Sequence, residues 1–129
     1  MNAIQFIKDH GVEKARGVVE GAPDKTASHY VISRRPHYYS VDFQSYFNNG
    51  DWHDSDYASE QDLANDYEPQ NVIRLSDLKR LVESVYIVKE HYTLDRAKKY
   101  AASPYTAPEL KVRLEQAIAD YESIGGEHV

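Results

Sequence analysis

The 129-residue sequence contains no cysteine. Disulfide bonds, thiolate metal ligands and a cysteine nucleophile are therefore excluded. No apolar run approaches the ~18 residues that a membrane-spanning helix needs, and no charged-then-apolar leader opens the chain. We therefore expect a cytoplasmic protein that has no membrane partner.

The motifs of common catalytic sites are also missing. The sequence has no phosphate-binding loop, no dinucleotide fingerprint, no Gly-x-Ser-x-Gly and no His-Glu-x-x-His. His53 lies among acids, but an EF-hand loop beginning at Asp54 would place Ser59 at the glycine position and Asn65 at the closing acid. We predict no catalytic residues, no cofactor and no dedicated metal site. A hydrolase or metal enzyme built around His53 is kept as an alternative.

Lysine and arginine are absent between Arg35 and Arg74. The acids of this stretch, Pro36 to Ile73, are Asp42, Asp51, Asp54, Asp56, Glu60, Asp62, Asp66 and Glu68. Interleaved with them are the aromatic residues Tyr38, Tyr39, Phe43, Tyr46, Phe47, Trp52, Tyr57 and Tyr67. Seven of the 21 acids lie within 51–68, so the rest of the chain has 14 acids against 15 bases. The net charge of −6 is therefore local.

This acidic aromatic stretch is the best candidate for a binding surface. Tryptophan and tyrosine are enriched at binding hot spots, and a rim of carboxylates steers a basic partner. The predicted protein-binding residues are Trp52, Asp54, Asp56, Tyr57, Glu60 and Asp62. The competing interpretation is a solvated loop whose neighbouring strand aromatics pack on helices.

Apolar periodicity predicts helices at both ends of the chain. One helical region covers 3–20 with a break at His10-Gly11, and another covers 76–92. Two further helices cover 94–101 and the region from Thr106 to about Tyr121, the latter ended by Gly125-Gly126. The predicted N-caps are Ser76, Thr93 and Thr106, the last with capping-box spacing to Glu109.

Three strands are predicted, over 29–33, 38–47 and 71–75, with a turn at 48–51 and a short helix from Ser59 to about Asp66. In the second strand we place Tyr39 and Tyr46 on opposite faces. The predicted fold class is α+β, with a small three-stranded antiparallel sheet packed against N-terminal and C-terminal helices. Residues 1–129 form a single domain in which 48–70 is an acidic exposed loop or insert.

The two ends of the chain also resemble each other. The segment 6–10 is similar to 87–91, and after one extra residue 12–16 is similar to 94–98. Either a helix–break–helix unit has been duplicated, or two ordinary amphipathic helix pairs share a composition.

A basic group near the C-terminal end supports a second function. Arg96, Lys98 and Lys99 lie on one predicted helix, which suggests a small nucleic-acid-binding regulator. The acidic pI of about 5.4 argues against this function, so we rank protein binding above it.

Several strings are similar to a group of small accessory proteins of largely uncharacterised function that are encoded by lambdoid phages and prophages. They are Gly21-Ala22-Pro23, Ser28-His29-Tyr30, the segment from Leu75 to Ser84, and the segment from Gln116 to Glu122. The resemblance supplies no catalytic residues. Together with the acidic aromatic stretch, it implies a non-enzymatic phage accessory protein in the host cytoplasm, a monomer or homodimer that binds a host protein as a possible DNA mimic.

Overall fold

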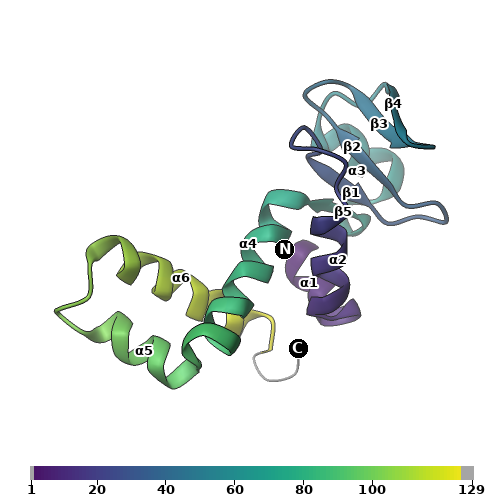
Figure 1. Ribbon diagram of the computed structural model, residues 1–129. Helices are drawn as coiled ribbons and strands as arrows, with labels where there is room; N and C mark the ends of the chain where they lie inside the picture. Colours follow the sequence, from purple (N-terminus) through teal and green to yellow (C-terminus); the bar gives the residue numbers. More distant parts are fainter. Residues whose placement is uncertain (1, 126–129) are drawn as a thin grey trace.

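The computed structural model describes residues 2–125 and is of the α+β class (Figure 1). Its helices are α1 (Asn2–His10), α2 (Val12–Glu20), α3 (Glu60–Tyr67), α4 (Leu75–Tyr86), α5 (Leu94–Ala102) and α6 (Pro108–Ser123). A 3₁₀ turn, η1, covers Pro69–Asn71, and a π-helix, η2, covers Ile87–Tyr92. The strands are β1 (His29–Val31), β2 (His37–Ser40), β3 (Ser45–Asn48), β4 (Asp51–Asp54) and β5 (Val72–Arg74). Gly126, expected to help end the last helix, lies outside the described residues.

The sheet has five antiparallel strands in the order β4-β3-β2-β1-β5, so the prediction of three strands is wrong. The expected second strand, 38–47, turns back on itself at 41–44, where Gln44 adopts a φ of 46°. Asn49 and Gly50, with φ values of 51° and 79°, then form the hairpin turn into β4. Segment 48–70, predicted as an exposed loop or insert, thus contains the edge strand β4, helix α3 and η1.

The two faces of the sheet pack against different helices. Tyr30, Tyr38 and Ile73 face the main core, which α1, α2 and α4 supply with residues such as Phe6 and Leu78. A smaller core on the other face is formed by the buried side chains Val31, Tyr39, Leu63 and Val72. Leu63 is the buried residue of α3, so α3 covers this second face through an apolar contact.

Helices α1 and α2 meet at Gly11, the break predicted from the sequence, where φ is 87° and ψ is 162°. Thr93 joins η2 to α5 with nearly the same backbone, φ 67° and ψ 157°. The similar segments at the two ends therefore both form a helix, a break and a helix. The extra residue of the second copy, Tyr92, falls in η2, because a π-helix accommodates one more residue per turn than an α-helix.

Of the predicted C-terminal helices, α4 packs on the sheet, whereas α5 and α6 do not. Helices α5 and α6 pack on each other and on α4 and η2, and they project away from the sheet as an arm (Figure 1). The arm has a small core of Ala97, Ala101 and Leu114. The accessible surface of 8042 Å² exceeds the roughly 7,000 Å² typical of a compact protein of this mass, as expected for an elongated shape.

The predicted helix caps are only partly right. Ser59 accepts a hydrogen bond from the Asp62 backbone N–H and begins α3 as predicted. Helix α4 instead begins at Leu75, before Ser76, and Thr106 donates its hydroxyl to the Tyr100 carbonyl rather than capping α6. A tertiary contact sets the start of α4, since Leu75 is buried in the main core and its N–H donates to the Ser28 carbonyl.

Candidate functional site

A cavity of about 310 Å³ lies where β2, β3 and the end of β4 meet the start and end of α3. We call it the tyrosine pocket. Its lining residues are His37, Tyr39, Tyr46, Asp54, Ser55, Asp56, Tyr57 and Tyr67. This volume is within the range of protein sites that hold a small ligand or a single side chain.

Cross-strand pairing and α3 bring the four tyrosine rings together. Tyr39 pairs with Tyr46 across β2 and β3, and their ring centroids are 6.2 Å apart. Tyr57 stands edge-on to Tyr39 at 5.6 Å and 84°, and Tyr67 lies 6.0 Å from Tyr39 and 5.8 Å from Tyr57. Rings at such different angles form several walls of the pocket rather than a single flat stack.

Hydrogen bonds fix two walls of the tyrosine pocket. The hydroxyls of Tyr39 and Tyr67 are 2.9 Å apart, and the Tyr57 hydroxyl donates to Asp66 Oδ2 at 2.7 Å. Burial raises the pKa of Tyr39 above its ordinary value, and the hydrogen bond to Asp66 does the same for the pKa of Tyr57. These rings therefore stay neutral phenols, with electron-rich faces, at any physiological pH.

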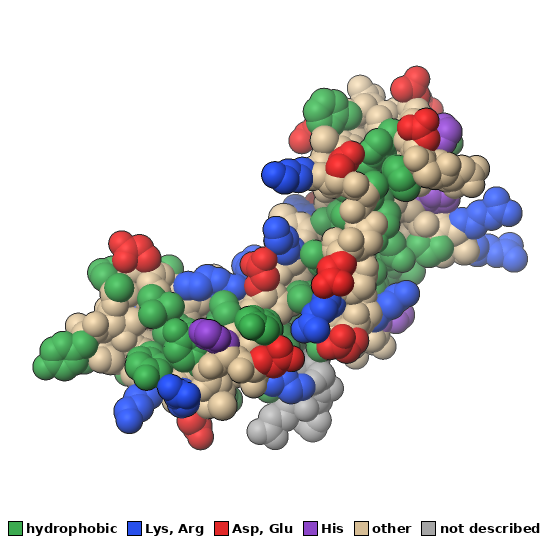
Figure 2. All heavy atoms as spheres, viewed as in Figure 1, with side chains coloured by type: hydrophobic (Ala, Val, Ile, Leu, Met, Phe, Trp, Pro, Cys, Tyr) green, Lys and Arg blue, Asp and Glu red, His purple; other side chains and the backbone are tan. Residues whose placement is uncertain are grey.

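Negative charge surrounds the pocket and is not neutralised locally. Asp54, Asp56 and Asp66 are exposed, and among the described residues no ion pair joins any of them to a cation. Figure 2 shows carboxylates gathered at the end of the molecule where β3 and β4 lie. Residues 36–73 contribute no lysine or arginine to this end, where the basic side chains visible in Figure 2 come from other segments, such as exposed Arg34 and Arg35 in the turn before β2.

The structure brings together three of the six predicted binding residues, Asp54, Asp56 and Tyr57. Trp52 lies on the opposite face of the sheet, because it pairs with Phe47 while its neighbour His53 pairs with Tyr46. The Trp52 indole N–H donates to Asp24 at 3.0 Å. The Asp62 carboxylate accepts a hydrogen bond from the Ala58 backbone N–H, so it already has a partner at the N-terminal end of α3.

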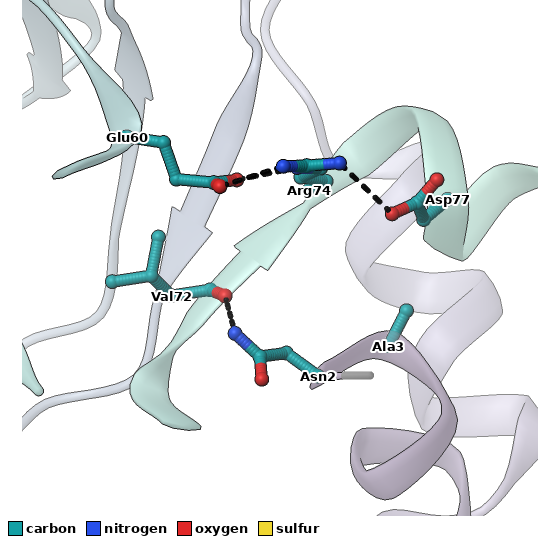
Figure 3. Close-up of a pocket in the computed structure, with 6 residues that line it drawn as sticks. All are labelled: Asn2, Ala3, Glu60, Val72, Arg74 and Asp77. Carbon is teal, nitrogen blue, oxygen red and sulfur yellow. Dashed lines mark hydrogen bonds and ion pairs between the residues drawn. The ribbon is translucent and has the colours of Figure 1, made fainter. Parts of the chain in front are cut away.

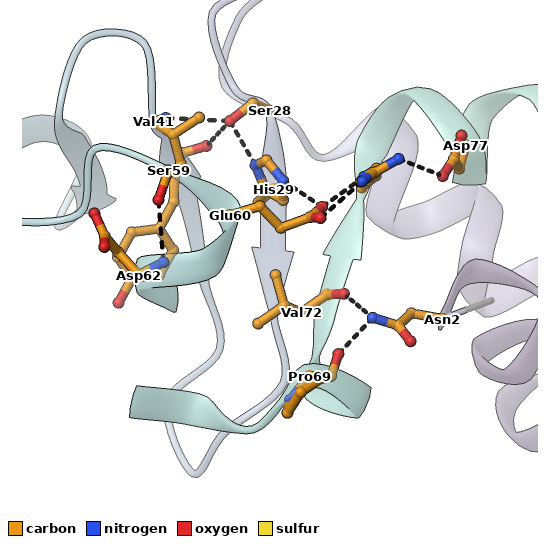
Figure 4. Close-up of polar contacts among 12 residues, drawn as sticks. Asn2, Ser28, His29, Val41, Ser59, Glu60, Asp62, Pro69, Val72 and Asp77 are labelled. Atoms are coloured by element: carbon orange, nitrogen blue, oxygen red, sulfur yellow. Dashed lines mark hydrogen bonds and ion pairs between the residues drawn. The ribbon is translucent and has the colours of Figure 1, made fainter. Parts of the chain in front are cut away.

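Glu60, the sixth predicted binding residue, belongs to a separate polar network (Figure 4). Arg74 forms a bidentate ion pair with Glu60, in which Nε donates to Oε1 at 2.6 Å and Nη2 donates to Oε2 at 2.8 Å. His29 Nε2 lies 3.0 Å from the same Oε1. The Arg74 guanidinium is the main reason that the pKa of Glu60 is lowered to about 2. Glu60 therefore stabilises the attachment of α3 to β1 and β5 and is a poor choice for contacting a partner.

The same network contains a hydroxyl, an imidazole and a carboxylate, because Ser28 Oγ lies 2.8 Å from His29 Nδ1. It lacks the properties of a catalytic triad. Ser28 Oγ accepts the Val41 backbone N–H at 3.2 Å, and Arg74 holds the carboxylate. Ser28 Oγ also lies 3.2 Å from the Tyr39 carbonyl oxygen, and His29 contacts Ser28 through Nδ1 and Glu60 through Nε2, so every group has a structural partner.

A second cavity, of about 220 Å³, adjoins this network beside Asn2, Glu60, Arg74 and Asp77 (Figure 3). Its polar groups bind one another: the Asn2 amide donates to the carbonyl oxygens of Val72 and Pro69, and Arg74 approaches Asp77 at 4.0 Å. A cavity whose donors and acceptors are already paired offers a ligand little.

The alternative sites receive less support from the geometry. Within residues 2–125 no group of three or more histidine, aspartate or glutamate side chains is placed to hold a metal, and His53 Nε2 lies 3.0 Å from the Asn48 carbonyl. On α5, Arg96 lies over the Tyr100 ring at 5.9 Å and Lys98 pairs with Glu122 at 3.9 Å. Over the same described range, no helix is both long enough and apolar enough to cross a membrane.

Tyr39, Tyr46 and Tyr67 are pocket residues that were not predicted. In one continuous strand over 38–47, strict alternation separates Tyr39 from Tyr46. A turn at 41–44 reverses the chain and returns Tyr46 to the same face. The available signal was the pair of polar residues Asp42 and Gln44 in the middle of the predicted strand.

No protein-family model, no curated protein and no solved structure matches this chain. The resemblance to phage accessory proteins therefore stays a prediction.

Proposed function

We propose that this chain is a non-enzymatic binding protein, a phage accessory protein that docks a basic surface of a host protein onto its acidic aromatic end. The observation that carries the proposal is the tyrosine pocket bordered by Asp54, Asp56 and Asp66, with no ion pair to these carboxylates among the described residues. Aromatic walls supply binding area at low entropic cost, and carboxylates supply long-range attraction.

The position of these carboxylates also supports a DNA-mimic mode of binding. Asp54 ends β4 and Asp66 lies in α3, so each is held by regular structure rather than by a free loop. Carboxylates fixed in this way take the place of phosphates on a protein surface that otherwise binds nucleic acid. Binding then weakens steeply with salt and competes with DNA.

The test compares two triple variants that change the net charge equally. Asp54→Asn, Asp56→Asn and Asp66→Asn neutralise the pocket rim, whereas Asp9→Asn, Glu109→Gln and Glu115→Gln neutralise exposed acids on other helices. Each tagged protein is used to capture partners from a bacterial host lysate. The affinity for each captured protein is then measured by calorimetry at several salt concentrations.

The rim variant is expected to lose at least tenfold in affinity for a basic captured protein and to lose most of its salt dependence, while the control variant retains both. Duplex DNA added to the mixture is expected to displace the partner. Equal affinity of the two triple variants would refute the proposal. A gel shift with DNA alone, abolished by replacing Arg96, Lys98 and Lys99, would favour the nucleic-acid alternative.

A further inference from the structure

We infer that the tyrosine pocket is an aromatic cage for one arginine side chain of the partner protein. This inference rests on the proposed function and names the group that the site recognises. It goes beyond the attraction of an acidic surface, because it assigns a defined cavity to a defined chemical group.

The arrangement of the rings favours a cation. A cation is attracted to the face of an aromatic ring when it lies within about 6 Å of the ring centroid. In the tyrosine pocket, the ring of Tyr39 is 5% exposed and packs against the half-buried rings of Tyr46, Tyr57 and Tyr67 at interplanar angles from 37° to 84°. Because these three half-buried rings all line the cavity, a cation bound there contacts more than one of them.

The polar groups of the pocket also favour a positively charged ligand. Asp54 and Asp56 line it, and Asp66 holds the Tyr57 hydroxyl from behind. These carboxylates exclude an anionic ligand and leave hydrogen-bond acceptors for a cationic donor. Among residues 2–125, His37 is the imidazole that lines the pocket, and it meets Tyr46 edge-on at 5.8 Å.

Arginine fits these features better than lysine. A guanidinium is planar, stacks on aromatic rings, and offers paired N–H donors to a carboxylate. It is also more weakly hydrated than an ammonium group, so its transfer into a ring-lined cavity costs less. A quaternary ammonium would also interact with the rings, but it has no N–H to donate to Asp54 or Asp56.

The experiment uses the full chain and capped tripeptides Gly-X-Gly, in which X is arginine, citrulline, lysine or trimethyllysine. Citrulline keeps the shape of arginine and removes its charge. Binding is followed by NMR, through the ring signals of Tyr46 and Tyr57 as peptide is added. Free arginine is titrated in parallel, to separate a peptide-borne side chain from a free amino acid as the ligand.

The arginine tripeptide is expected to shift these ring signals and to bind at least fivefold more tightly than the lysine or citrulline tripeptide. Tyr46→Leu, which removes a half-buried wall, is expected to weaken binding about tenfold. Tyr105→Leu, which replaces a 95% exposed tyrosine between α5 and α6, should bind within about twofold of the parent protein. An amide spectrum that is unchanged outside the pocket shows that each variant is folded.

Three results would overturn the inference: equal binding of the citrulline peptide, no effect of Tyr46→Leu, or tighter binding of trimethyllysine or of free arginine. Failure here is distinct from failure of the proposed function. If the rim variant loses its partner but no peptide moves the pocket signals, the acidic surface binds without a cage. If the peptide binds in the pocket and the rim variant keeps its partner, the proposed function fails.

Discussion

At the scale of single residues, the sharpest test concerns Glu60. Its folded pKa of about 2 lies below the ordinary value of 4.5, so its ionised form stabilises the fold. That contribution is complete above about pH 4.5 and is lost as the pH falls toward 2. Because 37% of the side chain is exposed, screening reduces the contribution to on the order of 1 kcal/mol.

Replacing this carboxylate with an amide, Glu60→Gln, should therefore lower the free energy of unfolding by that amount at neutral pH. Urea unfolding of both proteins from pH 7 to pH 2 measures the difference. The gap is expected to stay constant down to about pH 5 and to close below it. A gap that persists unchanged to pH 2 would show that Glu60 acts through packing and not through its charge.

Single residues also show where sequence reasoning about the site succeeds and fails. Asp54, Asp56 and Tyr57 are close in the chain, so a local charge pattern found them together. Tyr39 and Tyr67 join them only through strand pairing and the packing of α3, which local patterns do not encode. The ion pair of Glu60 was not foreseen because its partners, His29 and Arg74, lie outside the acidic stretch.

At the scale of elements, the two helix breaks form a natural comparison. Gly11 and Thr93 share a backbone conformation that is close to glycine-only. A β-branched residue held there stores on the order of 1–3 kcal/mol of strain. The first break contains the residue that suits its geometry, and the second does not.

Thr93→Gly is therefore expected to stabilise the protein by about 1 kcal/mol, since relief of strain exceeds the added chain entropy. Gly11→Thr should destabilise it by a similar or larger amount. Thermal unfolding measures both. Gly17→Ala is the control: this glycine lies inside α2 with open space where a Cβ would be, so alanine should raise stability through helix propensity alone. A destabilising Thr93→Gly would contradict the argument.

The helices were more predictable than the sheet for a physical reason. A helix such as α2 can be predicted from the apolar spacing within its own segment, and the break before it can be predicted from the single residue Gly11. Strand β4 has no such signature: at the sheet edge it contains Asp51, His53 and Asp54 with exposed side chains. Charge on an edge strand protects the edge from pairing with other chains, and the same charge made the segment resemble a loop.

At the scale of the whole molecule, the two ends are built differently (Figure 1). The sheet and α3 form the end with the tyrosine pocket, and α5 and α6 form an arm with a small core of its own. Ala117 and Tyr121 of α6 also belong to the main core, and polar contacts to α4 add to this apolar attachment. Asp120, 5% exposed, accepts from Ser84 at 2.7 Å, from Gln116 at 2.9 Å and from Arg80 at 3.2 Å.

Asp120→Ala should loosen the contact between α4 and α6 while leaving the sheet intact. Buried Ser84 loses its acceptor, whereas Arg80 is 38% exposed and keeps Asp77 as a partner, so the cost is on the order of 2 kcal/mol. Native-state hydrogen exchange is expected to show a loss of protection in α6 of roughly tenfold to a hundredfold, with a much smaller change in β1 and β2. Glu115→Ala, an exposed site on the same helix, should change neither. Loss of protection by the same factor in α6 and in the sheet would show that the arm and the sheet unfold as one unit, and that the site at one end is coupled to the packing at the other.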